Sequence, residues 1–236
     1  MSDFLPEFCA EHPTWRLNVA HVFFMQETKF KDSIKYYEPI VESSLQQDSI
    51  LSIQAIVLAN LCVGYIMTSQ NDRAEELMRE IEKEEEILER ETGGEHAPVY
   101  HLCIVNMVIG TLYCSKANFE FGIGRVTKSL EPIESKLSSD TWFYAKRCLL
   151  ALSEALSKHM IVLKDVTFHE ILEFLDECAK HGKDMVASVH DDDEGGTAGA
   201  ADPMGVRVGT TDAGVERTVQ AEAQMIKTLY LKLKDS

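Results

Sequence analysis

The sequence of 236 residues predicts an all-α fold made of antiparallel helical hairpins. First, apolar residues recur at helical spacing along most of the chain. Second, no segment alternates apolar and polar residues between turn residues, as a half-buried strand would. Third, one pattern of small and aromatic residues returns in separate segments, which is typical of a helical repeat protein.

The helices are expected to follow one another with only short polar breaks between them. Their expected ranges are 14–28, 31–45, 50–69, 71–91, 97–116, 119–136, 140–158, 165–181 and 214–234. Breaks such as Ser69–Asp72 and Ser115–Asn118 suit tight turns between antiparallel helices. We therefore expect one repeat array over residues 1–185, wound as an α-solenoid.

The segment after the array differs in composition. Residues 191–214 are rich in Gly, Asp, Thr and Ala, so they cannot bury enough surface to offset the entropy lost on ordering. We expect a flexible acidic, Gly-rich linker at 186–214 and a C-terminal helix at 215–236 that caps the array. The apolar stripe of that helix comprises Val215, Val219, Ile226, Leu229, Tyr230 and Leu233.

Charge and cysteine usage restrict the class of protein. Lys and Arg number 23 against 39 Asp and Glu, so the net charge of −16 opposes binding to nucleic acid or to anionic membranes. The longest apolar runs are interrupted by Asn60, Asn106 or Gly110, so no membrane insertion is expected. The first residues lack a secretion signal, and the six cysteines are scattered without a CxxC pair. We expect a cytoplasmic protein.

Two glycines stand inside the helix-like stretch 107–126, although each costs a helix about 1 kcal/mol relative to alanine. When two segments are aligned, Gly110 matches Cys62 and Gly122 matches Ala74. Each segment has a small residue, an aromatic residue three positions later, and a second small residue twelve positions after the first. This is the tetratricopeptide pattern, in which small residues allow the two helices of a hairpin to cross closely. The glycines are therefore expected at a hairpin crossing.

A third copy of the pattern is weaker, because His21 stands where a small residue is expected. The second small residues of the three copies lie 41 and 48 residues apart, whereas an ideal repeat has about 34 residues. The acidic run Glu80–Pro98 accounts for part of this excess by extending one helix. The predicted repeat-packing residues are Ala20, Phe24, Ser33, Cys62, Tyr65, Ala74, Gly110, Tyr113 and Gly122.

The first helix of each hairpin is expected to line the concave surface of the array. The residues projected onto this surface are Asn18, Val22, Met25, Gln26, Asn60, Val63, Ile66, Met67, Met107, Thr111 and Cys114. They include no Lys or Arg, which excludes a carboxylate-clamp co-chaperone. Either they bind an extended apolar or proline-containing segment, with amides bonding its peptide groups, or they only pack against neighbouring hairpins.

Other chemistry is poorly supported. The groups Cys178, His181 and His169, and His101, Cys103 and His96, lack four zinc ligands at a recognised spacing. The Gly-rich segment has no GK[ST] sequence, and no nucleophile–His–acid set is evident. We expect no cofactor, no metal and no enzymatic activity. The run KEEEILERE could instead dock a basic partner surface.

Long stretches resemble one family specifically. They are FLPEF, WRLNVAHVFFMQETKFKDSIKYYEPIVE, AIVLANLCVGYIMTSQNDRAEELMREIEKEEE, YHLCIVNMVIGTLYCSKANFEFGIGRV, SLEP, DTWFYAKRCLL and SKHMIVLKD. From about Phe4 to Lys180 the chain resembles the C-terminal part of the tetratricopeptide repeat protein 30, or intraflagellar transport protein 70, family.

This resemblance implies a non-enzymatic scaffold subunit of intraflagellar transport complex B. Its repeats would wind around an extended segment of a partner subunit, intraflagellar transport protein 52. The resemblance also implies work in the cilium or flagellum and a link to polyglutamylation of axonemal tubulin. The alternative from the residues alone is a free acidic adaptor that binds basic proteins.

Overall fold

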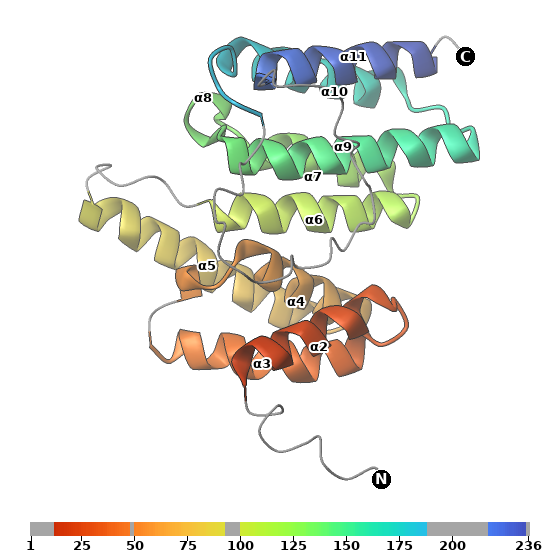
Figure 1. Cartoon of the computed structure of the whole chain (residues 1–236). Coiled ribbons are helices and arrows are strands. Elements are labelled where there is room, and N and C mark those ends of the chain that lie inside the picture. The colour runs from red at the N-terminus through yellow and green to blue at the C-terminus, as the bar shows by residue number, and fades with distance from the viewer. Residues whose placement is uncertain (1–11, 48–49, 93–99, 188–216, 235–236) are drawn as a thin grey trace. The chain divides into compact units, whose positions relative to one another are not determined.

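The computed structural model describes residues 12–47, 50–92, 100–187 and 217–234. They belong to two compact units, of which unit 1 ends at Val105 and unit 2 begins at Asn106. Figure 1 shows helices in both units, and the described residues contain no strand beyond one isolated bridge between Val186 and Thr218. The expected all-α class is therefore confirmed. Within the described residues, no helix is long and apolar enough to cross a membrane.

Unit 1 is a succession of helices in which each packs against the next. Its elements are α2 (Pro13–Met25), α3 (Phe30–Leu45), the short 3-10 helix η1 (Ile50–Ser52), α4 (Ala55–Met67) and α5 (Asn71–Thr92). Its core includes Tyr37, Ile50, Leu58, Leu61 and Ile81, all almost fully buried.

Unit 2 contains most of α6 and all later helices. Its elements are α6 (His101–Ser115), α7 (Phe119–Ser129), α8 (Ile133–Lys136), α9 (Ser139–His159), α10 (Asp165–His181) and α11 (Val219–Lys234). Helix α10 packs against α7 and α11, and α11 also packs against α9. Residues 188–216, which hold most of the predicted linker, lie outside the described residues.

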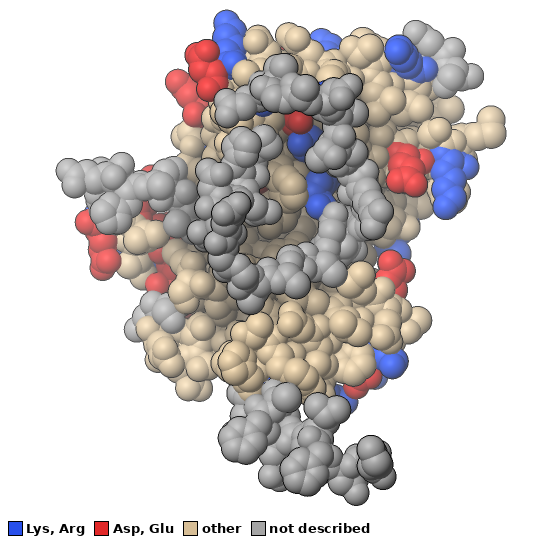
Figure 2. All heavy atoms as spheres, in the orientation of Figure 1, with Lys and Arg blue, Asp and Glu red and all other residues tan. Residues whose placement is uncertain are grey.

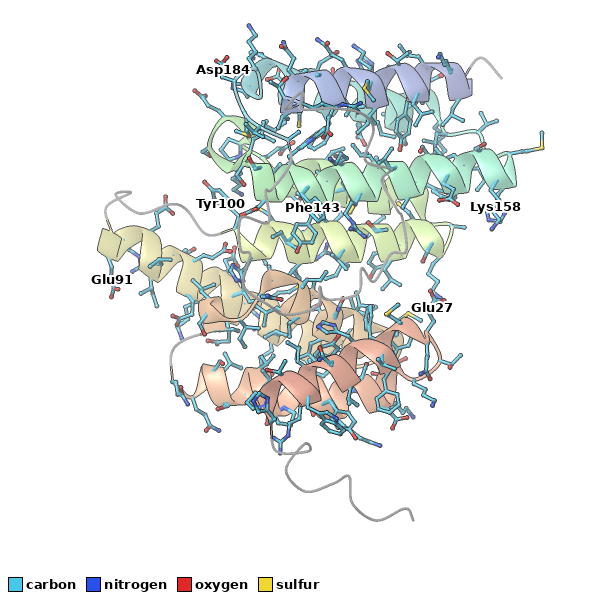
Figure 3. The ribbon with its side chains drawn as sticks, in the orientation of Figure 1. Glu27, Glu91, Tyr100, Phe143, Lys158 and Asp184 are labelled. Atoms are coloured by element: carbon cyan, nitrogen blue, oxygen red, sulfur yellow. The ribbon has the colours of Figure 1, made fainter. Side chains whose placement is uncertain are left out.

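The turns that close three helix pairs place a non-glycine residue in the left-handed backbone region. These residues are Glu27, Ser69 and Ala117, with φ values of 52°, 60° and 62°; Glu27 is labelled in Figure 3. After Ser69, the amide of Gln70 donates to the carbonyl of Tyr65 at 2.8 Å. The amide of Asn118 donates to the carbonyl of Tyr113 in the same way, at 3.0 Å. The α4–α5 and α6–α7 turns therefore share one helix-ending motif.

Two expected helices are interrupted. The range 119–136 was expected to be continuous, but α7 ends at Ser129 and α8 begins at Ile133. Pro132 causes the break, because proline has no amide hydrogen and disfavours helical geometry in the residue before it. The range 50–69 is also divided, between η1 and α4. The carbonyl of Ile53 at this division accepts a bond from Nε2 of His101 at 2.7 Å.

Helix α11 is joined to the rest of unit 2 by buried groups. Tyr230 is fully buried, and its hydroxyl donates to the carbonyl of Leu149 on α9 at 2.7 Å. Trp142 Nε1 and Lys146 Nζ on α9 both donate to Glu222 on α11, at 2.9 and 2.8 Å. The Trp142 ring is also fully buried. These contacts fix α11 on α9, while its role as a cap of the whole array remains a prediction.

Candidate partner-binding face

The residues predicted on the concave surface are divided between the two units. In unit 1, α2 presents Asn18, Val22 and Met25 on one face, and Gln26 follows at the end of the helix. All four are exposed, with Val22 at 55% and Met25 at 46% of their full surface. Trp15 continues this face at 38% exposure. Unit 1 therefore offers an exposed apolar strip on α2, bordered by amides and without a cation among these five residues.

The candidates on α4 are less accessible. Val63 and Asn60 are buried, whereas Ile66 and Met67 are partly exposed. The amide of Asn60 is already engaged, because its Nδ2 donates to the hydroxyl of Tyr37 on α3 at 3.2 Å. The prediction that Asn60 bonds a partner peptide would therefore require this internal bond to be exchanged.

In unit 2, the three candidates on α6 lie against neighbouring helices. Met107 is fully buried, and its carbonyl accepts from Thr111 Oγ1 at 3.0 Å and from Cys148 Sγ on α9 at 3.7 Å. Cys114 is also buried and faces α7 at Gly122. A binding role for these residues stays a prediction, and their surroundings in unit 2 are those of packed residues.

The glycines of the repeat pattern lie where α6 and α7 approach. A Cβ atom added to Gly110 would stand 2.7 Å from the carbonyl oxygen of Gly122 and 2.7 Å from a methyl group of Val126. One added to Gly122 would stand 2.6 Å from the carbonyl oxygen of Gly110 and 2.5 Å from Cys114 Sγ. These distances are far below van der Waals contact, so the two backbones touch at this crossing.

The corresponding positions in unit 1 carry side chains. Ala20, Ser33, Cys62, Tyr65 and Ala74 are buried, and Ser33 Oγ donates to the carbonyl of Phe30 at 2.9 Å. The ring of Phe24 meets those of Phe30 and Tyr37 edge to face. In unit 2, Tyr113 packs edge to face on Phe121 at a centroid separation of 4.7 Å.

Unit 1 contains two polar networks that the repeat pattern of the sequence does not predict. The hydroxyl of Tyr37 lies 2.7 Å from Nδ1 of His21 and accepts from Asn60, which connects α2, α3 and α4. The hydroxyl of Tyr65 donates to Glu38 at 2.8 Å, and Arg73 pairs with Glu38 while its guanidinium lies over the Tyr65 ring. The sequence predicts Tyr65 as a repeat residue, but it does not indicate that these side chains bond to partners 16 to 27 positions away.

The pKa values of the buried histidines and cysteines in both units are those of packed residues, not of catalytic or metal-binding groups. Burial lowers the pKa of His21 and that of His101. Burial raises the pKa of the Cys114 and Cys178 thiols to about 12 and that of Cys148 to about 11, so all three are protonated at neutral pH. Protonated thiols are poor nucleophiles and poor metal ligands. The part of the chain that the structure describes contains no group of three His, Cys, Asp or Glu arranged to hold a metal ion.

Charged side chains on the described surface are mixed in sign. Figure 2 shows acidic and basic side chains beside one another at several separate places. Ion pairs account for some of this mixing, as between Lys83 and Glu80 at 3.3 Å and between Lys227 and Asp176 at 2.6 Å. Exposed pairs of this kind contribute little to stability.

Comparison with known proteins identifies the family. The model of the intraflagellar transport protein 70 C-terminal domain matches residues 5–236. The chain is 51% identical to intraflagellar transport protein 70A of Danio rerio over 227 residues, which are 96% of the chain and 32% of that relative. It is 61% identical to intraflagellar transport protein 70A1 of Mus musculus over 181 residues, or 77% of the chain and 27% of that relative. The chain thus spans about a third or less of these relatives. It belongs to the intraflagellar transport protein 70 family.

Proposed function

We propose that the chain is part of a non-enzymatic scaffold subunit of intraflagellar transport complex B that clasps an extended segment of intraflagellar transport protein 52. The family match over residues 5–236 carries this proposal. The names of the relatives describe intraflagellar transport, which supports the cilium as the proposed place of work. The proposed link to polyglutamylation of axonemal tubulin rests on the family resemblance of the sequence alone. The residues that support the clasp best are those exposed on α2.

The exposed strip on α2 has the chemistry that an extended apolar segment requires. Val22 and Met25 expose about half of their surface, so covering them would remove apolar area from water. Asn18 and Gln26 flank them and can donate to and accept from the peptide groups of a bound strand. A segment held by apolar contacts and neutral amides should stay bound at high salt, since these contacts are not screened.

The test is co-expression with an extended segment of intraflagellar transport protein 52, read by size-exclusion chromatography with light scattering. We expect a one-to-one complex that survives high salt. The double variant Val22→Asp/Met25→Asp should bind at least tenfold more weakly, because two buried carboxylates would lack partners.

Two residues outside this strip provide a matched control. Val162 and Met160 follow α9, whose end is marked by Lys158 in Figure 3, and they are 92% and 89% exposed. The variant Met160→Asp/Val162→Asp makes the same substitutions and should leave the complex unchanged. Equal loss in both double variants would indicate a general charge effect and would count against the clasp. A soluble monomer that ignores the segment, even when the chain is replaced by a full-length relative such as intraflagellar transport protein 70A, would contradict the proposal.

A free acidic adaptor is the second candidate, and the outer face of α5 favours it. Seven carboxylates of this helix are exposed, namely Asp72, Glu75, Glu76, Glu82, Glu86, Glu89 and Glu91. Only part of this charge is paired along the helix, for example Glu86 with Arg90 at 3.7 Å. Binding of a basic partner here should weaken steeply between low and high salt, which distinguishes the adaptor from the clasp.

A further inference from the structure

Unit 2 has a groove on a different surface from the proposed clasp. Two adjoining depressions, of 480 and 640 Å³, are lined chiefly by α7 and α10 and share Lys128 and Glu170. Because they share these two residues, the depressions are neighbours, and we call them together the α7–α10 groove. None of the eleven candidates for the concave surface lines it.

The α10 side of the groove is strongly acidic. The carboxylates of this depression are Glu170, Glu173, Asp176 and Glu177 on α10 and Glu131 after α7, against the single cation Lys128. The other depression adds Glu120 and Arg125. Asp176 pairs with Lys227 at 2.6 Å, and Glu177 pairs with Lys180 at 3.0 Å. Glu170 and Glu131 have no ion-pair partner among the residues that the structure describes. Glu170 is partly buried and borders both depressions, so an unpaired carboxylate lies at the middle of the groove.

The α7 side of the groove offers a flat floor and an exposed aromatic ring. Gly124 lies in this floor, and a Cβ atom added there would meet nothing within 4 Å. Internal packing therefore does not require a glycine at this position, in contrast to Gly110 and Gly122. Glycine lowers the stability of a helix, and here it leaves open space in which another backbone can approach closely. Phe121 beside it is 50% exposed, and its ring is held edge to face by Tyr113.

Polar amides complete this end of the groove. Asn106 and Asn118 line it together with Phe121 and Gly124. Asn106 Oδ1 accepts from Arg125 Nε at 3.0 Å, which fixes the orientation of its amide. Amides beside a flat floor suit the peptide groups of an extended chain, and a half-exposed phenylalanine suits an apolar side chain or the stem of a lysine.

We propose that the α7–α10 groove binds an extended basic peptide segment. Its backbone lies over Gly124 beside Phe121, and a Lys or Arg side chain reaches Glu170 and Glu131. Charge complementarity selects this occupant, because the groove carries six carboxylates against the two cations Lys128 and Arg125, and Glu170 and Glu131 have no ion-pair partner among the described residues. The binding is independent of the clasp, since it uses the second helix of the α6–α7 pair and α10.

The experiment selects random twelve-residue peptides displayed on phage against the full chain and then measures the enriched peptides by fluorescence anisotropy. We expect enriched sequences to contain Lys or Arg, and their affinity to fall as salt rises. The variant Glu170→Lys should weaken binding at least tenfold. Gly124→Leu should do the same by filling the floor, without lowering the melting temperature, because the site is open.

Two controls distinguish the groove from general electrostatics. Glu154→Lys on α9 makes the same change of charge at an exposed residue that lines neither depression, and it should leave the affinity within twofold. A peptide in which Glu replaces the critical Lys should regain binding to the Glu170→Lys variant. The absence of enriched basic peptides would overturn the proposal, and so would peptides whose affinity ignores both Glu170→Lys and Gly124→Leu. Neither result depends on whether the α2 strip binds its own partner.

Discussion

The α6–α7 pair in unit 2 and the α2–α3–α4 group in unit 1 bring helices together in different ways. In unit 2 the backbones of Gly110 and Gly122 touch, and no space for a methyl group remains at the crossing. In unit 1 the helices meet around Tyr37, whose hydroxyl is bonded to His21 and Asn60. Helices of the same repeat pattern can therefore be packed together in two ways: by the absence of side chains at the crossing, or by hydrogen bonds between buried polar groups. The first solution should be sensitive to added atoms and the second to lost hydrogen bonds and to pH.

The largest effect is expected from adding one methyl group at the glycine crossing. Gly122→Ala should lower the free energy of unfolding by about 2–3 kcal/mol, because the new Cβ atom meets the backbone of α6 and forces the helices apart. Chemical denaturation monitored by circular dichroism measures this change.

Gly124→Ala in the same helix is the matched control. Its Cβ atom meets nothing, so the gain in helix propensity should raise the free energy of unfolding by about 0.5–1 kcal/mol. If both alanine variants had the same stability, the crossing would not be the reason for Gly122.

A smaller effect is expected from removing one hydroxyl in unit 1. Tyr37→Phe should cost about 1–2 kcal/mol, because the buried amide of Asn60 and the ring of His21 both lose a partner. Tyr113→Phe is the control, since its hydroxyl makes no hydrogen bond to any described residue and should be nearly neutral. Equal costs for the two variants would show that Tyr37 acts through packing alone.

The smallest effect is a dependence of unit 1 on pH. The pKa values of His21 and His101 are lowered by burial, so in this range the unfolded chain binds protons more readily than the folded one. The contribution of these two neutral histidines to the free energy of unfolding is therefore fully present above the unfolded pKa of about 6.5, and it falls as the pH drops below that value. The free energy of unfolding should be lower at pH 5.5 than at pH 7.5. The double variant His21→Gln/His101→Gln should show a smaller difference, and an unchanged difference would exclude these residues as the cause.

The fold class could be predicted because it depends on local periodicity. Apolar spacing and short polar breaks indicated helices in the right regions, and aligning the repeats paired Gly110 with Cys62 and Gly122 with Ala74. The break at Pro132 was also visible in the sequence, but the apolar residues on either side suggested a continuous helix. A local rule for proline overrides such a pattern.

The candidate site was less predictable, because accessibility depends on residues distant in sequence. Val22 and Asn60 both follow from the expected face of the first helix in a hairpin, yet one is exposed and the other is bonded to Tyr37. The α7–α10 groove likewise needs two helices that are separated by α8 and α9. The spacing of residues within one helix does not indicate which distant helix will pack beside it.

The position of Tyr230 has a consequence for how the chain is made. Proteins leave the ribosome from the N-terminus, and segments begin to fold as they emerge. The contacts between α9 and α11 cannot form until residue 230 has been translated, because the Tyr230 hydroxyl bonds the carbonyl of Leu149 and the Glu222 carboxylate bonds Nε1 of Trp142. Until then the surfaces of α9 and α10 that α11 covers in the folded unit are exposed to water, whereas all described helices of unit 1 have already been synthesised.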